Sequence, residues 1–117
     1  ADFVEQNYKR CALIRENIDR AGFGENTRVF CCSVNAALSR LNEEYDLILL
    51  DPPYSNSSLP KVLERLLDSG LVGANSTVVV QHSSRLPLVA DYGKFRVVKE
   101  RCYGDTCISI YRGDKEP

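Results

Sequence analysis

The run Tyr45–Leu50, Y-D-L-I-L-L, constrains the fold of this chain more than any other segment. Successive side chains of a strand point to opposite faces, and residues 47–50 are all apolar, so both faces of this strand are apolar. Such a strand is typical of the middle of a mainly parallel sheet that helices cover on both sides. The sequence therefore predicts an α/β fold with the strand 45–50 at its centre.

The rest of the chain alternates strand patterns with helix patterns. Further strands are expected at 2–5, 27–32, 77–81, 95–101 and 106–111, and helices at 7–21, 35–42 and 59–67. Gly22 and Gly70 are expected to end the first and third helices. The link C-Y-G-D-T is too short for a crossover helix, so the last two strands are expected to pair antiparallel. This order predicts a single domain over residues 1–117.

Composition excludes several classes of protein. The net charge is −1, with 44% hydrophobic and 26% charged residues, so no strong field draws the chain to nucleic acid or to a membrane. We expect neither a signal peptide nor a membrane span, and therefore a cytoplasmic protein. The number of cysteines is odd and no C-x-x-C pair exists, which predicts buried reduced thiols without a disulfide framework or a zinc site. These residues are Cys11, Cys31, Cys32, Cys102 and Cys107.

Two acidic residues follow expected strands, at the ends where open α/β sheets bind their ligands. Glu5 closes the first strand and Asp51 closes the central one. Nucleotide-binding folds use an acid in the position of Glu5 to hold ribose hydroxyls, although an exposed charge at a strand end is the alternative. The glycine-rich turn that such folds place after their first strand is absent. We therefore expect the chain to begin at the second strand of the fold, with the first β-α unit and its central strand missing.

Asp51 opens the segment D-P-P-Y. Two successive prolines lack N–H groups and fix φ, so they direct the chain out of the sheet along a rigid extended path. The side chain of Asp51 and the carbonyls of Pro52 and Pro53 then form a group of acceptors, which suits the exocyclic amino group of a nucleobase. Acceptors on both amine hydrogens free the nitrogen lone pair for attack, and the ring of Tyr54 offers a stacking face. A plain turn after a buried strand is the alternative.

Several segments together resemble a known family. L-I-L-L-D-P-P-Y-S-N resembles motif IV of S-adenosylmethionine-dependent amino-methyltransferases. The wider chain resembles the RsmD-type family, which methylates the amino group of a guanine in bacterial small-subunit ribosomal RNA. F-V-E-Q-N resembles the second motif of that family, and E-R-C-Y-G-D-T-C-I-S-I-Y-R resembles its closing hairpin. The resemblance implies a Rossmann-like methyltransferase sheet with an antiparallel C-terminal hairpin, S-adenosylmethionine as cofactor and no metal.

The resemblance also implies roles for individual residues. Glu5 would bind the ribose of the cofactor, and Ser33 and Val34 fall where the family places a pair that contacts adenine. The family usually has Asp or Asn at the first of these two positions, so Ser33 departs from the pattern. Residues 51–54 would orient the target amine, with Tyr54 stacked on the flipped base.

His82 has a second, less specific signal. An imidazole that titrates near neutral pH could serve as a general base. Methyl transfer to an amine needs little help from a base, however, because the proton can leave after the new bond has formed. We therefore expect His82 to be a packed or hydrogen-bonded residue at a strand end.

The predicted function is transfer of a methyl group from S-adenosylmethionine to a guanine amino group, with ribosomal RNA or the small ribosomal subunit as partner. One alternative is amino-methylation of adenine in DNA, which uses similar D-P-P-Y acceptors. Another is a truncated, non-catalytic module that binds nucleic acid or a protein partner, which the absent glycine-rich loop favours. The missing strand leaves two strand edges unpaired unless they close up or a second copy fills the gap, so a homodimer is also expected.

Overall fold

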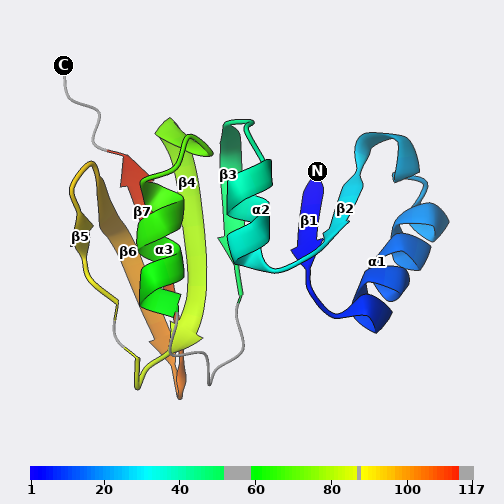
Figure 1. Ribbon diagram of the computed structural model, residues 1–117. Helices are drawn as coiled ribbons and strands as arrows, with labels where there is room; N and C mark the ends of the chain where they lie inside the picture. The colour runs from blue at the N-terminus through cyan, green and yellow to red at the C-terminus, as the bar shows by residue number, and fades with distance from the viewer. Residues whose placement is uncertain (52–58, 87, 114–117) are drawn as a thin grey trace. The chain divides into compact units, whose positions relative to one another are not determined.

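The computed structural model describes residues 1–51, 59–86 and 88–113 (Figure 1). The chain forms two compact units, Ala1–Leu41 and Asn42–Pro117, here named unit 1 and unit 2. They contain separate sheets, one of two strands and one of five. The expectation of a single domain therefore stays a prediction.

Unit 1 is built on a pair of parallel strands. Its elements are β1 (Asp2–Glu5), α1 (Tyr8–Ala21), the short 3-10 helix η1 (Gly24–Asn26), β2 (Arg28–Cys31) and α2 (Val34–Arg40). The register runs from Asp2 opposite Arg28 to Glu5 opposite Cys31, so both strands end at the same edge. The strand and helix pattern of the sequence is confirmed here to within two residues at each boundary, and η1 is an addition to it.

Helix α1 begins and ends where local chemistry dictates. The Asn7 side chain accepts a hydrogen bond from the Arg10 backbone N–H at 3.1 Å, which supplies one of the acceptors that a helix start lacks. Gly22 follows the helix with φ 80°, a left-handed conformation that costs glycine little, and its N–H bonds to the Asp19 carbonyl. The prediction that Gly22 ends this helix is confirmed.

Unit 2 is a five-stranded sheet with strand order β3-β4-β7-β6-β5. Its elements are β3 (Tyr45–Leu50), α3 (Leu59–Leu67), β4 (Val72–Ser83), β5 (Asp91–Tyr92), β6 (Phe95–Tyr103) and β7 (Thr106–Gly113). β3 pairs parallel with β4, whereas β4, β7, β6 and β5 pair antiparallel in turn. The expected antiparallel pairing of the last two strands is confirmed. β4 is longer than expected, and the two-residue strand β5 was not predicted.

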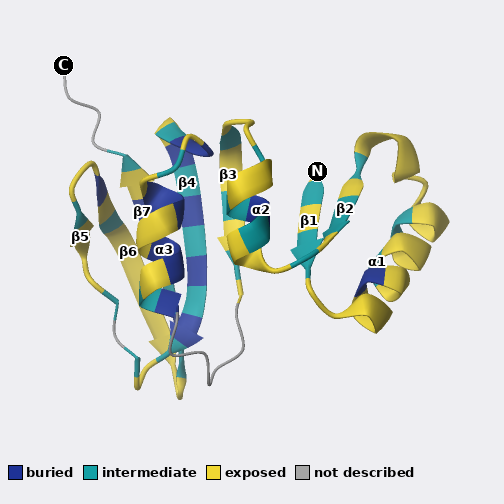
Figure 2. Cartoon of the chain, viewed as in Figure 1, coloured by how far each residue is buried: buried dark blue, intermediate teal, exposed yellow. Residues whose placement is uncertain are grey.

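The core of unit 2 lies between α3 and one face of the sheet (Figures 1 and 2). Every residue of the apolar stripe on α3 is buried: Leu59, Val62, Leu63, Leu66 and Leu67. Beneath them Val78, Val80 and Tyr111 are fully buried on β4 and β7. Within the described part of the chain, no helix is long and apolar enough to cross a membrane.

The β6–β7 hairpin corrects the expectation about cysteines. Gly104 has φ 60° at the first position of a two-residue turn, which suits the twist of a hairpin, and Tyr103 lies opposite Thr106. The next pair along the two strands is Cys102 and Cys107, whose Cα atoms are 4.0 Å apart and whose sulfurs form a disulfide. Directly opposite residues face the same side of a sheet, which makes this bond geometrically natural. Of the three free cysteines, Cys11 is buried, whereas Cys31 is exposed and Cys32 is half-buried.

Strand β3 does not have the central place that its sequence predicts. Among the described residues it pairs with β4 alone, and β1 likewise pairs with β2 alone, so each is an edge strand of its own sheet. Leu47 and Leu49 are 58% and 71% exposed, whereas Ile48 and Leu50 are half-buried. The prediction that both faces of this strand are covered is wrong for the face that carries Leu47 and Leu49. The expected homodimer stays a prediction.

Candidate functional site

Glu5 is held in one orientation at the carboxyl end of β1. One of its carboxylate oxygens accepts the Asn7 backbone N–H at 3.1 Å, and the other lies 3.7 Å from Nη1 of Arg10. The amino end of α1 adds the positive end of a helix dipole, which favours a carboxylate there. The Glu5 side chain is 24% exposed. A carboxylate has about four acceptor positions, so these contacts leave Glu5 able to accept hydrogen bonds from two hydroxyl groups.

Ser33 and Val34 lie at the same edge of the unit 1 sheet. Glu5 is opposite Cys31 in register, and Ser33 follows two residues after Cys31. The Ser33 hydroxyl accepts the Ala36 backbone N–H at 3.1 Å, so it caps helix α2 and keeps its own proton free to donate. Val34 begins the helix and is 36% exposed. The structure thus brings these three predicted cofactor residues to one strand edge.

Asp51 lies at the carboxyl end of the parallel pair β3–β4. It follows Leu50, which is opposite Val80, and its side chain is exposed. This is the edge at which α/β sheets bind ligands. The other predicted catalytic residues, Pro52, Pro53 and Tyr54, lie outside the described residues.

His82 is buried near the same end of β4, with 4% of its surface exposed. Nδ1 lies 3.2 Å from the carbonyl oxygens of Ser83 and Leu86, and Nε2 lies 2.8 Å from the Ser109 hydroxyl. The prediction of a packed, hydrogen-bonded residue is confirmed. Both ring nitrogens are engaged within the protein, which argues against a general base that must reach a substrate.

The predicted site residues are divided between the units. Glu5, Ser33 and Val34 belong to unit 1, and Asp51 belongs to unit 2. Sequence reasoning missed Asn7 and Arg10, which orient Glu5 through a backbone N–H and a guanidinium group. An available signal was Asn7 itself, because asparagine just before a helical pattern marks a helix cap.

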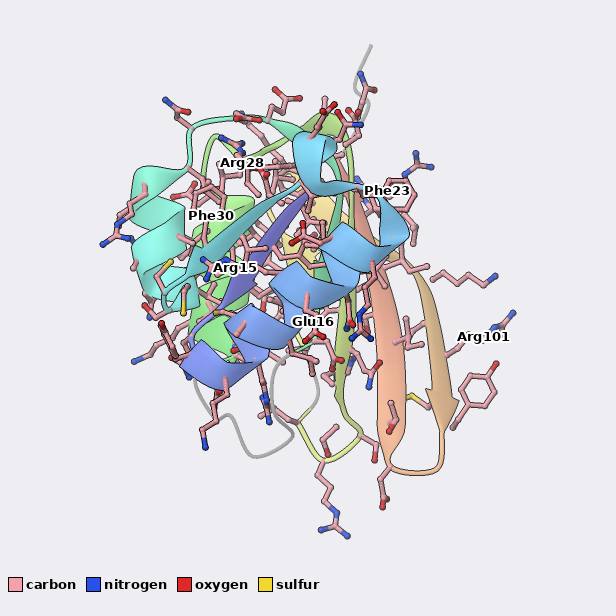
Figure 3. All side chains as sticks on the ribbon, turned by 90° about the vertical axis from the view of Figure 1, so that its right-hand side faces the viewer. Arg15, Glu16, Phe23, Arg28, Phe30 and Arg101 are labelled. Carbon is pink, nitrogen blue, oxygen red and sulfur yellow. A yellow bond between two sulfur atoms is a disulfide. The ribbon has the colours of Figure 1, made fainter. Side chains whose placement is uncertain are left out.

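One ion pair and one hollow of unit 1 lie near the start of β1 and β2, away from Glu5. Arg28 forms a bidentate ion pair with Asp2 at the start of the strands. Its Cζ atom lies 5.4 Å from the centroid of the Phe30 ring (Figure 3). A hollow of about 540 Å³ is lined mainly by apolar side chains, among them Phe3 of β1, Ile18 of α1 and Phe23, which precedes η1. The candidate site is therefore defined by the strand ends and not by this hollow.

The fold is similar to that of several solved structures, some of which are described as methyltransferases. A conserved hypothetical protein of Streptococcus pyogenes has a TM-score of 0.86 at 26% identity, covering 95% of this chain and 69% of its own. The Escherichia coli protein described as "Putative methyltransferase yhhF" has a TM-score of 0.87 at 17% identity, covering 99% and 64% of the two chains. Together with the observed strand order, these likenesses define a Rossmann-like methyltransferase sheet with an antiparallel C-terminal hairpin.

The chain belongs to the family described as Conserved hypothetical protein 95, which matches residues 1–112. This is the RsmD-type methyltransferase family that the sequence motifs resemble, so that resemblance is confirmed. "Putative rRNA methyltransferase YlbH" of Bacillus subtilis (strain 168) is 21% identical over 113 residues, which are 94% of this chain. The chain spans 61% of the length of YlbH.

Proposed function

We propose that this protein transfers a methyl group from S-adenosylmethionine to the exocyclic amino group of a guanine in small-subunit ribosomal RNA. The observation that carries the proposal is the exposed Asp51 at the carboxyl end of β3, in a member of the RsmD-type family. The description of the relative YlbH, "Putative rRNA methyltransferase", supports the choice of RNA. Because ribosomes are in the cytoplasm, a ribosomal substrate implies that the protein is cytoplasmic.

Unit 1 supplies the cofactor contacts in this proposal. The two hydroxyls of a ribose suit the acceptor positions left on Glu5, whose carboxylate is fixed by the Asn7 N–H at 3.1 Å. Ser33 can donate its hydroxyl proton to the adenine, and Val34 offers an apolar contact beside it. S-adenosylmethionine, when bound, supplies an electrophilic methyl group on its sulfonium. Glu5 thereby fixes where that group lies.

Unit 2 supplies the contacts to the target base. The Asp51 carboxylate accepts a hydrogen from the guanine amine, with the carbonyls of Pro52 and Pro53 as further acceptors and the Tyr54 ring as the stacking face. Withdrawal of the amine hydrogens toward acceptors makes the nitrogen lone pair available for an in-line displacement. Catalysis then rests on positioning, which lowers the barrier by removing the need to orient free reactants. The amine proton leaves afterwards, and His82 takes no part.

The test compares two exposed aspartates of the same strand region. Asp51→Asn replaces an acceptor-only group with one that also donates, whereas Asp46→Asn makes the same change at the other end of β3. Methyl transfer from labelled S-adenosylmethionine is measured on small ribosomal subunits, on their free RNA and on duplex DNA. We expect transfer to RNA, with about a hundredfold loss in Asp51→Asn, as for removal of other preorganised polar groups, and none in Asp46→Asn.

Other outcomes separate the alternatives. If methyl transfer occurred only to adenine in DNA, the substrate would be DNA and the proposal of an RNA substrate would be wrong. Binding of RNA without transfer, unaffected by Asp51→Asn, would indicate a non-catalytic module. Equal loss in the two variants would remove Asp51 from its proposed role.

A further inference from the structure

Three polar side chains form a continuous chain of hydrogen bonds across β4, β7 and β6. His82 Nε2 lies 2.8 Å from the Ser109 hydroxyl, which in turn lies 3.0 Å from Oε2 of Glu100. His82 and Ser109 are buried, at 4% and 0% exposure, whereas Glu100 is exposed. Glu100 is directly opposite Ser109 in register, so the two side chains share a face of the sheet. The chain thus leads from the core of unit 2 to its surface.

The number of hydrogens needed along this chain can be counted. Nδ1 of His82 faces two carbonyl oxygens at 3.2 Å, and carbonyls only accept, so Nδ1 carries a proton. If the ring is neutral, Nε2 is an acceptor and takes the single proton of the Ser109 hydroxyl. No hydrogen is then left to form a bond between the Ser109 oxygen and the Glu100 carboxylate, which lies 3.0 Å away. All of these contacts are hydrogen bonds only when the three side chains together hold one further proton.

We propose that His82, Ser109 and Glu100 share this one proton and that it ties the carboxyl end of β4 to the β6–β7 hairpin. His82 is the imidazolium form and donates through Nε2 to Ser109, which donates to the Glu100 carboxylate. The proton belongs on the ring because Glu100 is exposed and water stabilises its charge. Both ring N–H groups have protein acceptors, as a buried charge requires. The inference is independent of the proposed methyl transfer.

The neighbouring groups leave Glu100 as the counter-charge. Cys102 and Cys107, on the same hairpin, do not titrate because they form the disulfide. Tyr111 follows Ser109 two residues along β7 and donates its hydroxyl to the Val89 carbonyl at 2.7 Å. Burial, together with the charges of Tyr92 and Glu100, raises the pKa of Tyr111, so it stays neutral. α3 covers this face with its apolar stripe, and Arg85 and Asp105 lie in the exposed turns after β4 and β6.

The position of these three side chains decides which segments of unit 2 the shared proton links. Through Nδ1, His82 contacts the carbonyls of Ser83, the last residue of β4, and of Leu86 in the segment that follows. The Ser84 N–H bonds to the Asp105 carbonyl in the hairpin turn. This is the edge of the unit 2 sheet at which Asp51 follows β3. Without the shared proton, Ser109 could donate to only one of its two neighbours, and the link between β4 and β6 would be weaker. The three side chains therefore link β4 to the hairpin at this edge of the sheet.

The chain contains one histidine, which makes a direct measurement simple. Nitrogen NMR of the imidazole at pH 7 is expected to show both ring nitrogens protonated in the folded protein. In Glu100→Gln the amide donates to the Ser109 oxygen, so the hydroxyl turns to Nε2 and the ring becomes neutral. The resonance of an unprotonated ring nitrogen should therefore be gained in Glu100→Gln and stay absent in the control Glu64→Gln. An unprotonated ring nitrogen in the unmodified protein would overturn the proposal. So would an imidazole spectrum of Glu100→Gln that is the same as that of the unmodified protein.

A second readout tests the link itself. Ser109→Ala removes the hydroxyl from the middle of the set, and the loss of one hydrogen bond is expected to speed amide exchange at Leu86 about fivefold relative to Val78 in the core strand. The ratio should stay near that of the unmodified protein in Glu100→Gln, where a donor replaces the shared proton. An unchanged ratio in Ser109→Ala would show that the set does not hold this segment.

Discussion

Units 1 and 2 differ sharply in how much apolar surface they bury. Among the described residues, the buried apolar side chains of unit 1 are Cys11 and Ala37, while all the others belong to unit 2, most of them on α3, β4 and β7 (Figure 2). Unit 1 also leaves Phe3, Leu13 and Phe23 exposed by 43%, 56% and 61%. A stretch of about 40 residues with a two-stranded sheet rarely folds stably without help. Hydrogen bonds and helix caps therefore account for a larger share of the order of unit 1 than of unit 2.

This difference in burial matches the proposed roles, in which unit 1 contacts the cofactor and unit 2 contacts the target base. A ligand that binds only the folded form stabilises it by RT ln(1 + c/Kd), where c is its free concentration, so the proposed cofactor would add stability to a region that buries little apolar surface. The residues proposed to position the target base need a rigid support instead, and Asp51 follows a strand paired with β4, whose Val78 and Val80 are fully buried. The account predicts that the two units respond differently to the same kind of perturbation.

The largest effect is expected from truncation of a core leucine. Leu63 on α3 has no exposed surface, so Leu63→Ala should lower the free energy of unfolding by about 2–5 kcal/mol, the cost of lost burial and of a cavity. Leu13→Ala makes the same change at an exposed position of α1 and should cost less than about 0.5 kcal/mol. Urea unfolding followed by circular dichroism measures both. Equal losses would remove the contrast between the units.

The second prediction concerns the one buried thiol of unit 1. Burial, with the hydrogen bond and charge of Cys31, raises the pKa of Cys11 from 9.0 to about 11. The thiolate is the reactive form, so alkylation of Cys11 at pH 8 should be about a hundredfold slower than that of an ordinary exposed thiol. Because the folded-state pKa exceeds the unfolded value, stability from this group is present below pH 9 and lost between about 9 and 11.

Mass spectrometry of the labelled protein separates Cys11 from the exposed Cys31, and Cys11→Ala is expected to remove the stability change between pH 9 and 11. Fast labelling of Cys11 would show that unit 1 opens readily. Slow labelling whose rate rises with pH as it does for an ordinary thiol would show that the pKa of Cys11 is not raised.

A smaller effect is expected from the disulfide of unit 2. The Cys102–Cys107 bond closes a loop with a sequence separation of five residues, so its removal should cost about 2 kcal/mol by the chain-entropy relation for such a short loop. A thiol reductant applied to the unmodified chain should lower the unfolding midpoint of unit 2, with no further loss in Cys102→Ser. A matched Cys31→Ser variant should keep the full response to reductant. An unchanged midpoint would show that hairpin pairing alone holds these strands.

The sequence predicted regular elements well because their signals are local. The strand 45–50 was predicted to the residue, and the stop at Gly22 followed from a glycine behind an apolar helical stripe. The disulfide was missed because cysteines were read by spacing motifs, although a two-residue turn at Gly104 and Asp105 places Cys102 opposite Cys107. β5 was missed because two residues give no periodicity.

The candidate site was predicted less completely, because its environment depends on distant segments. Glu5 and Asp51 lie at strand ends as expected, since strand boundaries can be located from apolar runs. That Ser33 also caps α2 was not foreseen, and neither was the contact between His82 and Ser109, which are 27 residues apart. The exposure of Leu47 and Leu49 likewise depends on which elements cover β3, which a single strand pattern does not encode.

The central claim, that unit 1 holds the cofactor and unit 2 positions the base, is tested most directly by separating binding from turnover. Calorimetry with S-adenosylmethionine and steady-state methyl transfer are measured for Glu5→Gln and Asp51→Asn, with the exposed Glu16→Gln and Asp46→Asn as controls. We expect Glu5→Gln to weaken cofactor binding at least about tenfold, as for a hydrogen bond to a charged group. Asp51→Asn should leave cofactor binding unchanged and lower kcat about a hundredfold. Loss of cofactor binding in Asp51→Asn, or normal binding in Glu5→Gln, would contradict this account.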